Sequence, residues 1–157
     1  IDYTIAIKSD PDYVNAYNDR GIAYHNLGKY NTAISDYTTA IRLDPDDAFA
    51  YYNRGVAYAD LGNYNTAIAD YTTAIRLDPD DADAYNNRGA AYHNLGKYNT
   101  AISDYTTAIR LDPDYAVAYK NRGVAKENAG LSYCSDYKRA CELGEKTCCE
   151  WYNDQCR

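Results

Sequence analysis

The chain has 157 residues, of which 46% are hydrophobic and 25% charged, and its formal net charge is −7. An acidic chain that shows no basic stripe is not expected to bind nucleic acid or an anionic membrane surface. No apolar run approaches the roughly 20 residues of a membrane-spanning helix, so we expect no membrane span.

A 34-residue repeat dominates the chain. Residues 25–46 and 93–114 are identical, and residues 59–80 are a close copy of them. The four prolines mark the same phase of the repeat: Pro11, Pro45, Pro79 and Pro113. The chain opens in the middle of this pattern, so we expect a fragment or a processed chain and draw nothing from the lack of a signal peptide.

Each unit of the repeat divides into two helical stretches. In the first unit, Tyr17, Gly21 and Tyr24 follow each other at intervals of four and three, which places them on one helical face. Gly28 can end the first helix, Pro45 ends the second, and the aspartates beside the proline can cap the next helix. The pattern predicts a helix remnant over 1–8, first helices over 14–27, 48–61, 82–95 and 116–129, and second helices over 31–43, 65–77 and 99–111.

A glycine recurs in the middle of each first helix, where it costs up to ~1 kcal/mol relative to alanine, so we expect a close helix approach there. An arginine precedes each glycine, and aspartates recur in the second helices: Arg20, Arg54, Arg88 and Arg122, with Asp36, Asp70 and Asp104 and, by correspondence, Asp136. We interpret them as structural ion pairs between packed helices, and we name Arg54, Arg88, Asp36 and Asp70 as members. An arginine ladder for an acidic ligand is the alternative.

All five cysteines lie at the C-terminal end, where the repeat degrades: Cys134, Cys141, Cys148, Cys149 and Cys156. We expect a shortened second helix over 132–143 and a capping helix over 145–155, because an array of helix pairs needs a cap at its open apolar end. If these helices run antiparallel about Gly144, Cys134 and Cys156 are about equally far from the turn, and Cys141 is near Cys148 and Cys149. Two disulfides would fit, with Cys148 or Cys149 left free.

Three alternatives for these cysteines stay open at this point. Buried free thiols are common in protein cores. A thiolate metal site lacks the support of a close cysteine pair or a nearby histidine, and an odd thiol can link two chains. If the cysteines are bridged, we expect an extracytoplasmic or secreted protein, and otherwise a cytoplasmic one.

The pattern resembles the tetratricopeptide repeat family. One unit satisfies all seven of the family's characteristic aromatic, small and proline places: Tyr51, Gly55, Tyr58, Ala67, Tyr71, Ala74 and Pro79. The resemblance covers residues 1–130 and implies an all-α, right-handed superhelical solenoid of 34-residue helix–turn–helix repeats. We expect a second-helix remnant at 1–13, three full repeats at 14–115, a shortened fourth repeat at 116–143 and a Cys-rich capping helix at 144–157.

The resemblance also implies that partners bind the concave face, which the first helices line. Asn53, Asn87 and Asn121 form a file there, and their amides can either hold a peptide backbone or satisfy neighbouring groups and water. Phe49, Tyr52 and Val56 form an apolar patch that could anchor a partner or be covered by another copy of the chain. The candidate partner-binding residues are Phe49, Tyr52, Asn53, Val56, Asn86, Asn87, Lys120 and Asn121.

We predict no catalytic site, no cofactor and no metal. The two histidines, His25 and His93, lie two repeats apart, which is too far to share one zinc ion. The sequence has no glycine-rich phosphate loop. The lysine–asparagine pair with which related chaperone cofactors hold a terminal carboxylate is also missing, so we do not expect a receptor for chaperone tails.

The leading hypothesis is a non-catalytic protein–protein interaction scaffold that binds an extended peptide or a partner helix in its groove. The first alternative is a structural protein that assembles head-to-tail with copies of itself into a multimer or filament, because the near-identical repeats and the apolar face of the half repeat favour stacking. The second is a non-catalytic module of a larger enzyme, which predicts a catalytic sequence upstream of Ile1. The expected partner is a protein or peptide, including another copy of the chain.

Overall fold

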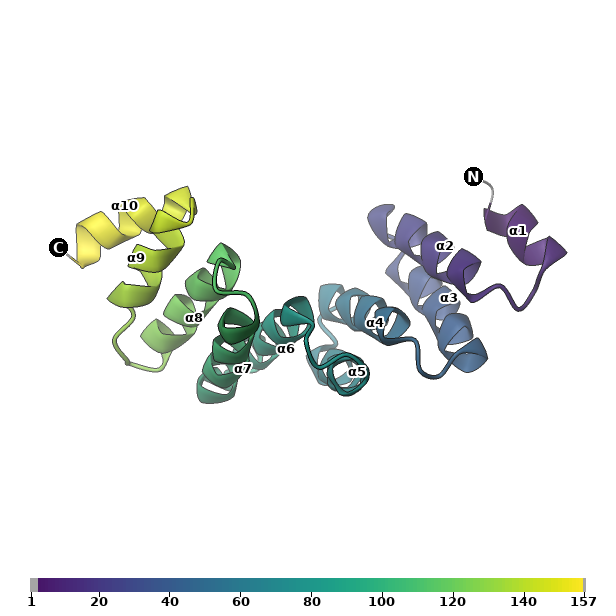
Figure 1. Cartoon of the computed structure of the whole chain (residues 1–157), viewed down its shortest axis with the longest axis horizontal. Coiled ribbons are helices and arrows are strands. Elements are labelled where there is room, and N and C mark those ends of the chain that lie inside the picture. Colours follow the sequence, from purple (N-terminus) through teal and green to yellow (C-terminus); the bar gives the residue numbers. More distant parts are fainter. Residues whose placement is uncertain (1–2, 157) are drawn as a thin grey trace. The chain divides into compact units, whose positions relative to one another are not determined.

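The chain is all-α, as its computed structural model shows over the described residues, 3–156. The predicted segments at the two ends include Ile1, Asp2 and Arg157, which lie outside this range. Residues 3–156 form ten helices and no strand (Figure 1). These are α1 (Tyr3–Ser9), α2 (Val14–Asn26), α3 (Tyr30–Leu43), α4 (Ala48–Asp60), α5 (Tyr64–Leu77), α6 (Ala82–Asn94), α7 (Tyr98–Leu111), α8 (Ala116–Asn128), α9 (Cys134–Glu142) and α10 (Lys146–Gln155). The predicted helix–turn–helix repeats are confirmed.

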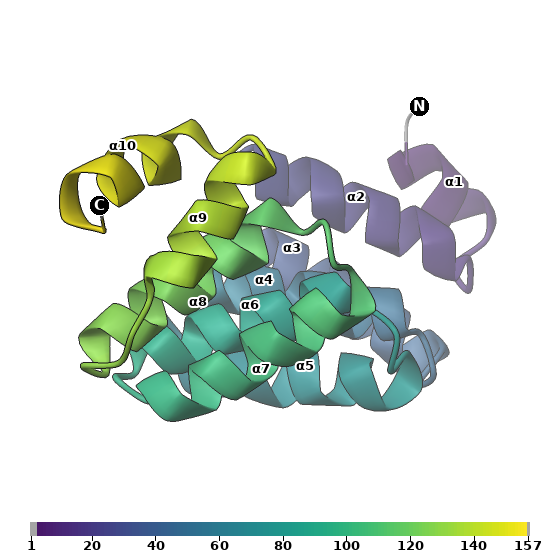
Figure 2. The ribbon, with the colours of Figure 1, turned by 60° about the vertical axis from the view of Figure 1, so that its left-hand side comes forward.

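The helices fall into two compact units. Residues 1–79 contain α1 to α5, and residues 80–157 contain α6 to α10. Within the first unit, α2 packs on α3 and α4 on α5, and within the second, α6 packs on α7 and α8 on α9. The last helix, α10, packs on α9, as Figure 2 shows. Each unit therefore buries its apolar faces between successive helices.

The turn between the helices of a pair depends on a glycine. Gly28 has a φ of 71°, a left-handed conformation that is unfavourable for residues with a Cβ. The next N–H group, that of Lys29, donates to the carbonyl oxygen of Tyr24 at 2.9 Å and satisfies a group at the end of α2. Gly28 therefore ends the helix and lets the chain fold back, as predicted.

Aspartate caps start two of the first helices. The Oδ1 atom of Asp47 accepts hydrogen bonds from the N–H groups of Phe49 at 3.0 Å and Ala50 at 3.2 Å. Asp81 caps α6 in the same way. Tyr13 and Tyr115 hold the equivalent positions before α2 and α8, and neither gives its helix a side-chain cap. Of these four helices, α4 and α6 therefore have the predicted aspartate cap, and α2 and α8 do not.

The core of each helix pair is built from glycine, alanine and tyrosine. The ring of Tyr71 lies so close to α4 that a Cβ atom on Gly55 would stand 2.8 Å from its Cε1 atom. Ala67 and Ala74 are fully buried beside this contact. The mid-helix glycine is therefore required for the close approach that the sequence predicts.

An arginine–aspartate pair joins the two helices of each repeat. In α4 and α5, Nε and Nη2 of Arg54 donate to the two carboxylate oxygens of Asp70, both at 2.8 Å. The arginine also lies 5.6 Å from the ring centre of Tyr51 and donates to Thr38 of the preceding repeat. The same pairing occurs between Arg20 and Asp36, Arg88 and Asp104, and Arg122 and Asp136. The hydrogen bond to Asp70 raises the pKa of Arg54, while burial opposes this rise.

The C-terminal hairpin, formed by α9 and α10, is bridged near both ends. One disulfide joins Cys134 to Cys156, and another joins Cys141 to Cys149. The thiol of Cys148 is free and buried, and burial raises its pKa. Of the two pairings that the sequence left open for Cys141, the structure therefore has the one with Cys149.

Candidate partner-binding site

In the first unit, the predicted apolar patch lies on α4. Phe49 is 51% exposed, while Tyr52 and Val56 are half-buried. The ring of Tyr52 packs against that of Tyr71 with 6.0 Å between centroids. The amide Nδ2 of Asn53 donates to the carbonyl oxygen of Phe49 at 2.8 Å, within the same helix. Phe49 is thus the member of this patch that is most accessible to a partner.

A polar contact that the sequence analysis missed connects α2 to α4. Nδ2 of Asn18 donates to Oδ2 of Asp47 at 2.6 Å, so Asn18 supports the residue that caps α4. The Oδ1 atom of Asn18 is buried and has no hydrogen-bond partner among the described residues. The two residues are 29 positions apart, and this separation does not match the 34-residue period, so the repeat pattern does not predict their contact.

In the second unit, the predicted asparagines bond to one another. Nδ2 of Asn121 on α8 donates to Oδ1 of Asn86 on α6 at 3.0 Å, and Nδ2 of Asn86 donates to Oδ1 of Asn87 at 3.3 Å. Lys120 stands beside them and forms an ion pair of 3.5 Å with Glu145. Several of the amide groups that we expected to meet a partner are therefore already engaged within the unit.

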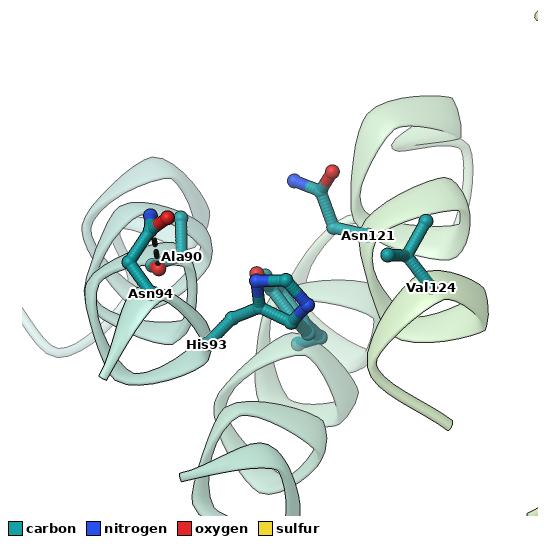
Figure 3. Close-up of a pocket in the computed structure, with 6 residues that line it drawn as sticks. Ala90, His93, Asn94, Asn121 and Val124 are labelled. Atoms are coloured by element: carbon teal, nitrogen blue, oxygen red, sulfur yellow. Dashed lines mark hydrogen bonds between the residues drawn. The ribbon is translucent and has the colours of Figure 1, made fainter. Parts of the chain in front are cut away.

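An open pocket of about 200 Å³ lies between the first helices of the second unit (Figure 3). Its lining comes from three helices: Ala90, His93 and Asn94 on α6, Tyr105 on α7, and Asn121 and Val124 on α8. Figure 3 shows His93 reaching into the space between α6 and α8, with Asn121 and Val124 on its far side. The pocket combines apolar walls with several hydrogen-bonding groups.

Neighbouring groups orient the polar side chains of this pocket. Nε2 of His93 lies 2.9 Å from Nδ2 of Asn128, so it accepts a hydrogen from that amide. The Nδ2 atom of Asn94 donates to the carbonyl oxygen of Ala90 at 2.9 Å. Burial is the main cause that raises the pKa of Tyr105, and the nearby carboxylate of Asp104 adds to it. The phenol of Tyr105 is therefore neutral at physiological pH.

Of the residues that line this pocket, Asn121 is a predicted partner-binding residue. His93 was considered as a possible metal ligand, and Tyr105 and Asn94 were not among the predicted site residues. The signal that could have indicated the pocket is the small side chain of Ala90, which lies opposite Val124 and leaves space next to Tyr105.

The described part of the chain has neither a cluster of metal-ligating side chains nor a membrane-spanning helix. Within residues 3–156 there is no group of three or more histidine, cysteine, aspartate or glutamate side chains that could hold a metal ion. Among the described helices, none combines the length and the apolar composition that crossing a membrane requires.

Three family models match the chain. The model described as TPR repeat matches residues 24–62 and 57–96. Two models described as Tetratricopeptide repeat match residues 3–35 and 82–115. The matches together extend from α1 to residue 115, directly before α8. Among curated proteins, none matches the chain.

Solved structures are similar to the chain over most of its length. A crystal structure of MamA is 33% identical, with a TM-score of 0.85, over 92% of this chain and 86% of the MamA chain. The first TPR domain of Spaghetti (RPAP3), bound to the HSP90 peptide SRMEEVD, is 29% identical, with a TM-score of 0.73, over 74% of this chain and 93% of that one. The second TPR domain of human RPAP3, in complex with the HSP70 peptide SGPTIEEVD, is 36% identical, with a TM-score of 0.68, over 70% and 92%.

Proposed function

Because the chain belongs to the tetratricopeptide repeat family, we propose that it is a non-catalytic protein–protein interaction scaffold. It binds an extended peptide or a partner helix against its first helices. The observation that carries this proposal is the open pocket between α6 and α8, whose lining mixes apolar and hydrogen-bonding side chains. The matched family models describe repeats, and none of them describes a catalytic domain.

The structures of RPAP3 support this proposal by analogy. Two TPR domains of that protein, similar to this chain over at least 70% of its residues, are bound to peptides. A peptide fits such a surface because its backbone can bond to side-chain amides while its side chains enter pockets. We assign partner contacts in the first unit to Phe49, Tyr52, Asn53 and Val56, and in the second to Asn86, Asn87, Lys120 and Asn121.

Selection of binders from a random-peptide library tests the proposal. Ala90→Arg fills the pocket, so we expect the selected peptides to bind this variant at least 10-fold more weakly than the wild-type chain. Ser103→Arg places the same charge on the exposed surface of α7 and should leave binding unchanged. Circular dichroism verifies that both variants are folded. A library that yields no binder, or peptides that ignore both substitutions, would contradict a groove-binding role.

Light scattering over a dilution series separates peptide binding from self-assembly. A monomer at all concentrations agrees with a scaffold that is open to other partners. Polymers that grow with concentration would instead favour the alternative of head-to-tail self-assembly. Non-reducing mass measurement of the same sample counts the disulfides.

A further inference from the structure

The hydroxyl group of Tyr105 forms the unsatisfied part of the pocket floor. Tyr105 is only 2% exposed, yet it lines the pocket in the second unit. No described residue forms a hydrogen bond with this hydroxyl. It also does not belong to the fully buried atoms without a partner, so it faces the open space of the pocket. A ligand that enters the pocket therefore meets a phenol that is ready to donate.

The last repeat shows what such a tyrosine binds when the chain supplies a partner. Tyr137 holds the place in α9 that Tyr105 holds in α7, and its hydroxyl donates to Oε2 of Glu127 at 3.3 Å. Glu127 is the counterpart of His93, one repeat later. The ring of His93 is turned to Asn128 instead. The oxygen acceptor that the last repeat carries internally is thus missing above Tyr105.

The pocket also contains side-chain amide oxygens, which accept hydrogen bonds and therefore need a donor from the ligand. Asn121 uses its Nδ2 atom to bond with Asn86, and this leaves its Oδ1 atom as an available acceptor beside the pocket. The same holds for Asn94, whose Nδ2 atom is turned to Ala90. The pocket therefore offers one neutral donor and amide oxygens as acceptors.

We propose that this pocket is a specificity site for a carboxamide side chain, asparagine or glutamine, of a bound peptide. The carboxamide oxygen accepts from Tyr105, its NH₂ group donates to the oxygen of Asn121, and its methylene groups contact Val124. A volume of about 200 Å³ is below the ~300 Å³ of sites that enclose a whole small molecule, which agrees with a single side chain. A carboxylate would satisfy the tyrosine alone, and the net charge of −7 disfavours it.

This inference rests on the proposed peptide-binding function, and one experiment separates the two. A random-peptide library is selected on the wild-type chain, on Tyr105→Phe and on the matched control Tyr37→Phe, which removes the equivalent hydroxyl from the first unit. We expect asparagine or glutamine to be enriched at one peptide position on the wild-type chain and on Tyr37→Phe. The enrichment should disappear on Tyr105→Phe, which loses no hydrogen bond within the protein and should fold normally.

Affinities of one selected peptide complete the test. Tyr105→Phe should weaken its binding about 5-fold, as expected for the loss of one neutral hydrogen bond. Replacing the enriched residue by leucine should weaken binding to the wild-type chain and have a smaller effect on Tyr105→Phe, because the two groups are coupled.

Each other outcome overturns a distinct statement. Enrichment of aspartate or glutamate that depends on Tyr105 would replace the carboxamide by a carboxylate. Selected peptides without any preference for polar oxygen-bearing side chains, or with the same preference on Tyr105→Phe, would overturn the specificity site and leave peptide binding intact. A library without binders would overturn the proposed function and the inference together.

Discussion

The repeats and the C-terminal hairpin are both pairs of packed helices, but different interactions hold them together. In the repeats, helices of 13 and 14 residues pack through a glycine, a tyrosine and a buried arginine–aspartate pair. In the hairpin, α9 and α10 have only 9 and 10 residues, and two disulfides join them. Helices this short bury little surface and are marginal on their own, so covalent links compensate for missing packing.

The aromatic contacts of the repeats also differ from those of the hairpin. The repeats bury tyrosines against backbone at glycine, whereas the hairpin packs Trp151 against Tyr137 with 4.7 Å between ring centroids. Trp151 is the single tryptophan of the chain, so its fluorescence reports on the hairpin alone. Circular dichroism mainly reports on the repeats, which hold most of the helical residues. The two regions can therefore be followed separately in one unfolding experiment.

The largest effect is expected from breaking an arginine–aspartate pair in a repeat. Arg54→Ala leaves the carboxylate of Asp70, which is 8% exposed, without its partner. We expect the free energy of unfolding to fall by about 3 kcal/mol or more in urea titrations. The exposed pair of Lys138 and Glu142 in the hairpin provides the control, and Lys138→Ala should cost less than about 0.5 kcal/mol. Similar losses in both variants would contradict the structural role of the repeat pair.

Removing one disulfide should act on the hairpin first. Cys134→Ser combined with Cys156→Ser opens a link that spans 22 residues, and we expect a loss of about 3 kcal/mol in hairpin stability. The Trp151 fluorescence transition should then occur at lower urea concentration than the loss of helical ellipticity. Cys148→Ala, which keeps both disulfides, should lower the stability of the hairpin by only about 1 kcal/mol. Coincident transitions in the double variant would show that the hairpin and repeats unfold as one.

A matched pair of glycine substitutions compares the packing directly. Gly55→Ala places a Cβ atom 2.8 Å from the Tyr71 ring, and the overpacking should outweigh the gain in helix propensity, with a net loss of about 1–2 kcal/mol. In Gly123→Ala the nearest atom of Tyr137 is 3.4 Å away, an ordinary contact. We expect this variant to be neutral or more stable by up to ~1 kcal/mol. Equal destabilisation of both variants in thermal unfolding would refute the difference in packing.

Alkaline pH should act on the repeat core with the smallest effect. Burial raises the pKa of Tyr37 from 10.0 to about 12, so the folded state holds a proton that the unfolded state loses. This contribution to stability is present below pH 10 and is lost as the pH rises through 12. We expect Tyr37 to contribute about 1 kcal/mol to the fall in the free energy of unfolding between pH 10 and pH 11 in urea titrations. Tyr37→Phe should lessen this fall, and an equal slope in both proteins would argue against the shifted tyrosine.

The periodic features of the chain could be predicted because each depends on neighbours at a constant separation. The glycine turns, the helix ends before the prolines and the 16-residue spacing of Arg54 and Asp70 recur with the repeat. In the last repeat the spacing of Arg122 and Asp136 is 14, in agreement with the two residues missing from its turn.

The candidate site was harder to predict, because it depends on side chains that vary between repeats. Asn121 bonds to Asn86 of the preceding repeat, whereas Asn53, the counterpart of Asn121, bonds to its own helix. Which partner an asparagine bonds to depends on its side-chain rotamer and on the groups available on the adjacent helix. The repeat pattern of the sequence gives information on neither the rotamer nor these groups.

The sequence by itself determined the helices, their pairing within repeats and the residues that make the close contacts. It could do so because backbone conformation and buried size are constrained at every copy of the repeat. Only the tertiary structure decided which cysteine pairs with Cys141 and that a pocket opens above Tyr105. These features depend on distances between atoms of successive helices, where a change of one side chain, such as alanine at position 90, leaves or removes the space for a ligand.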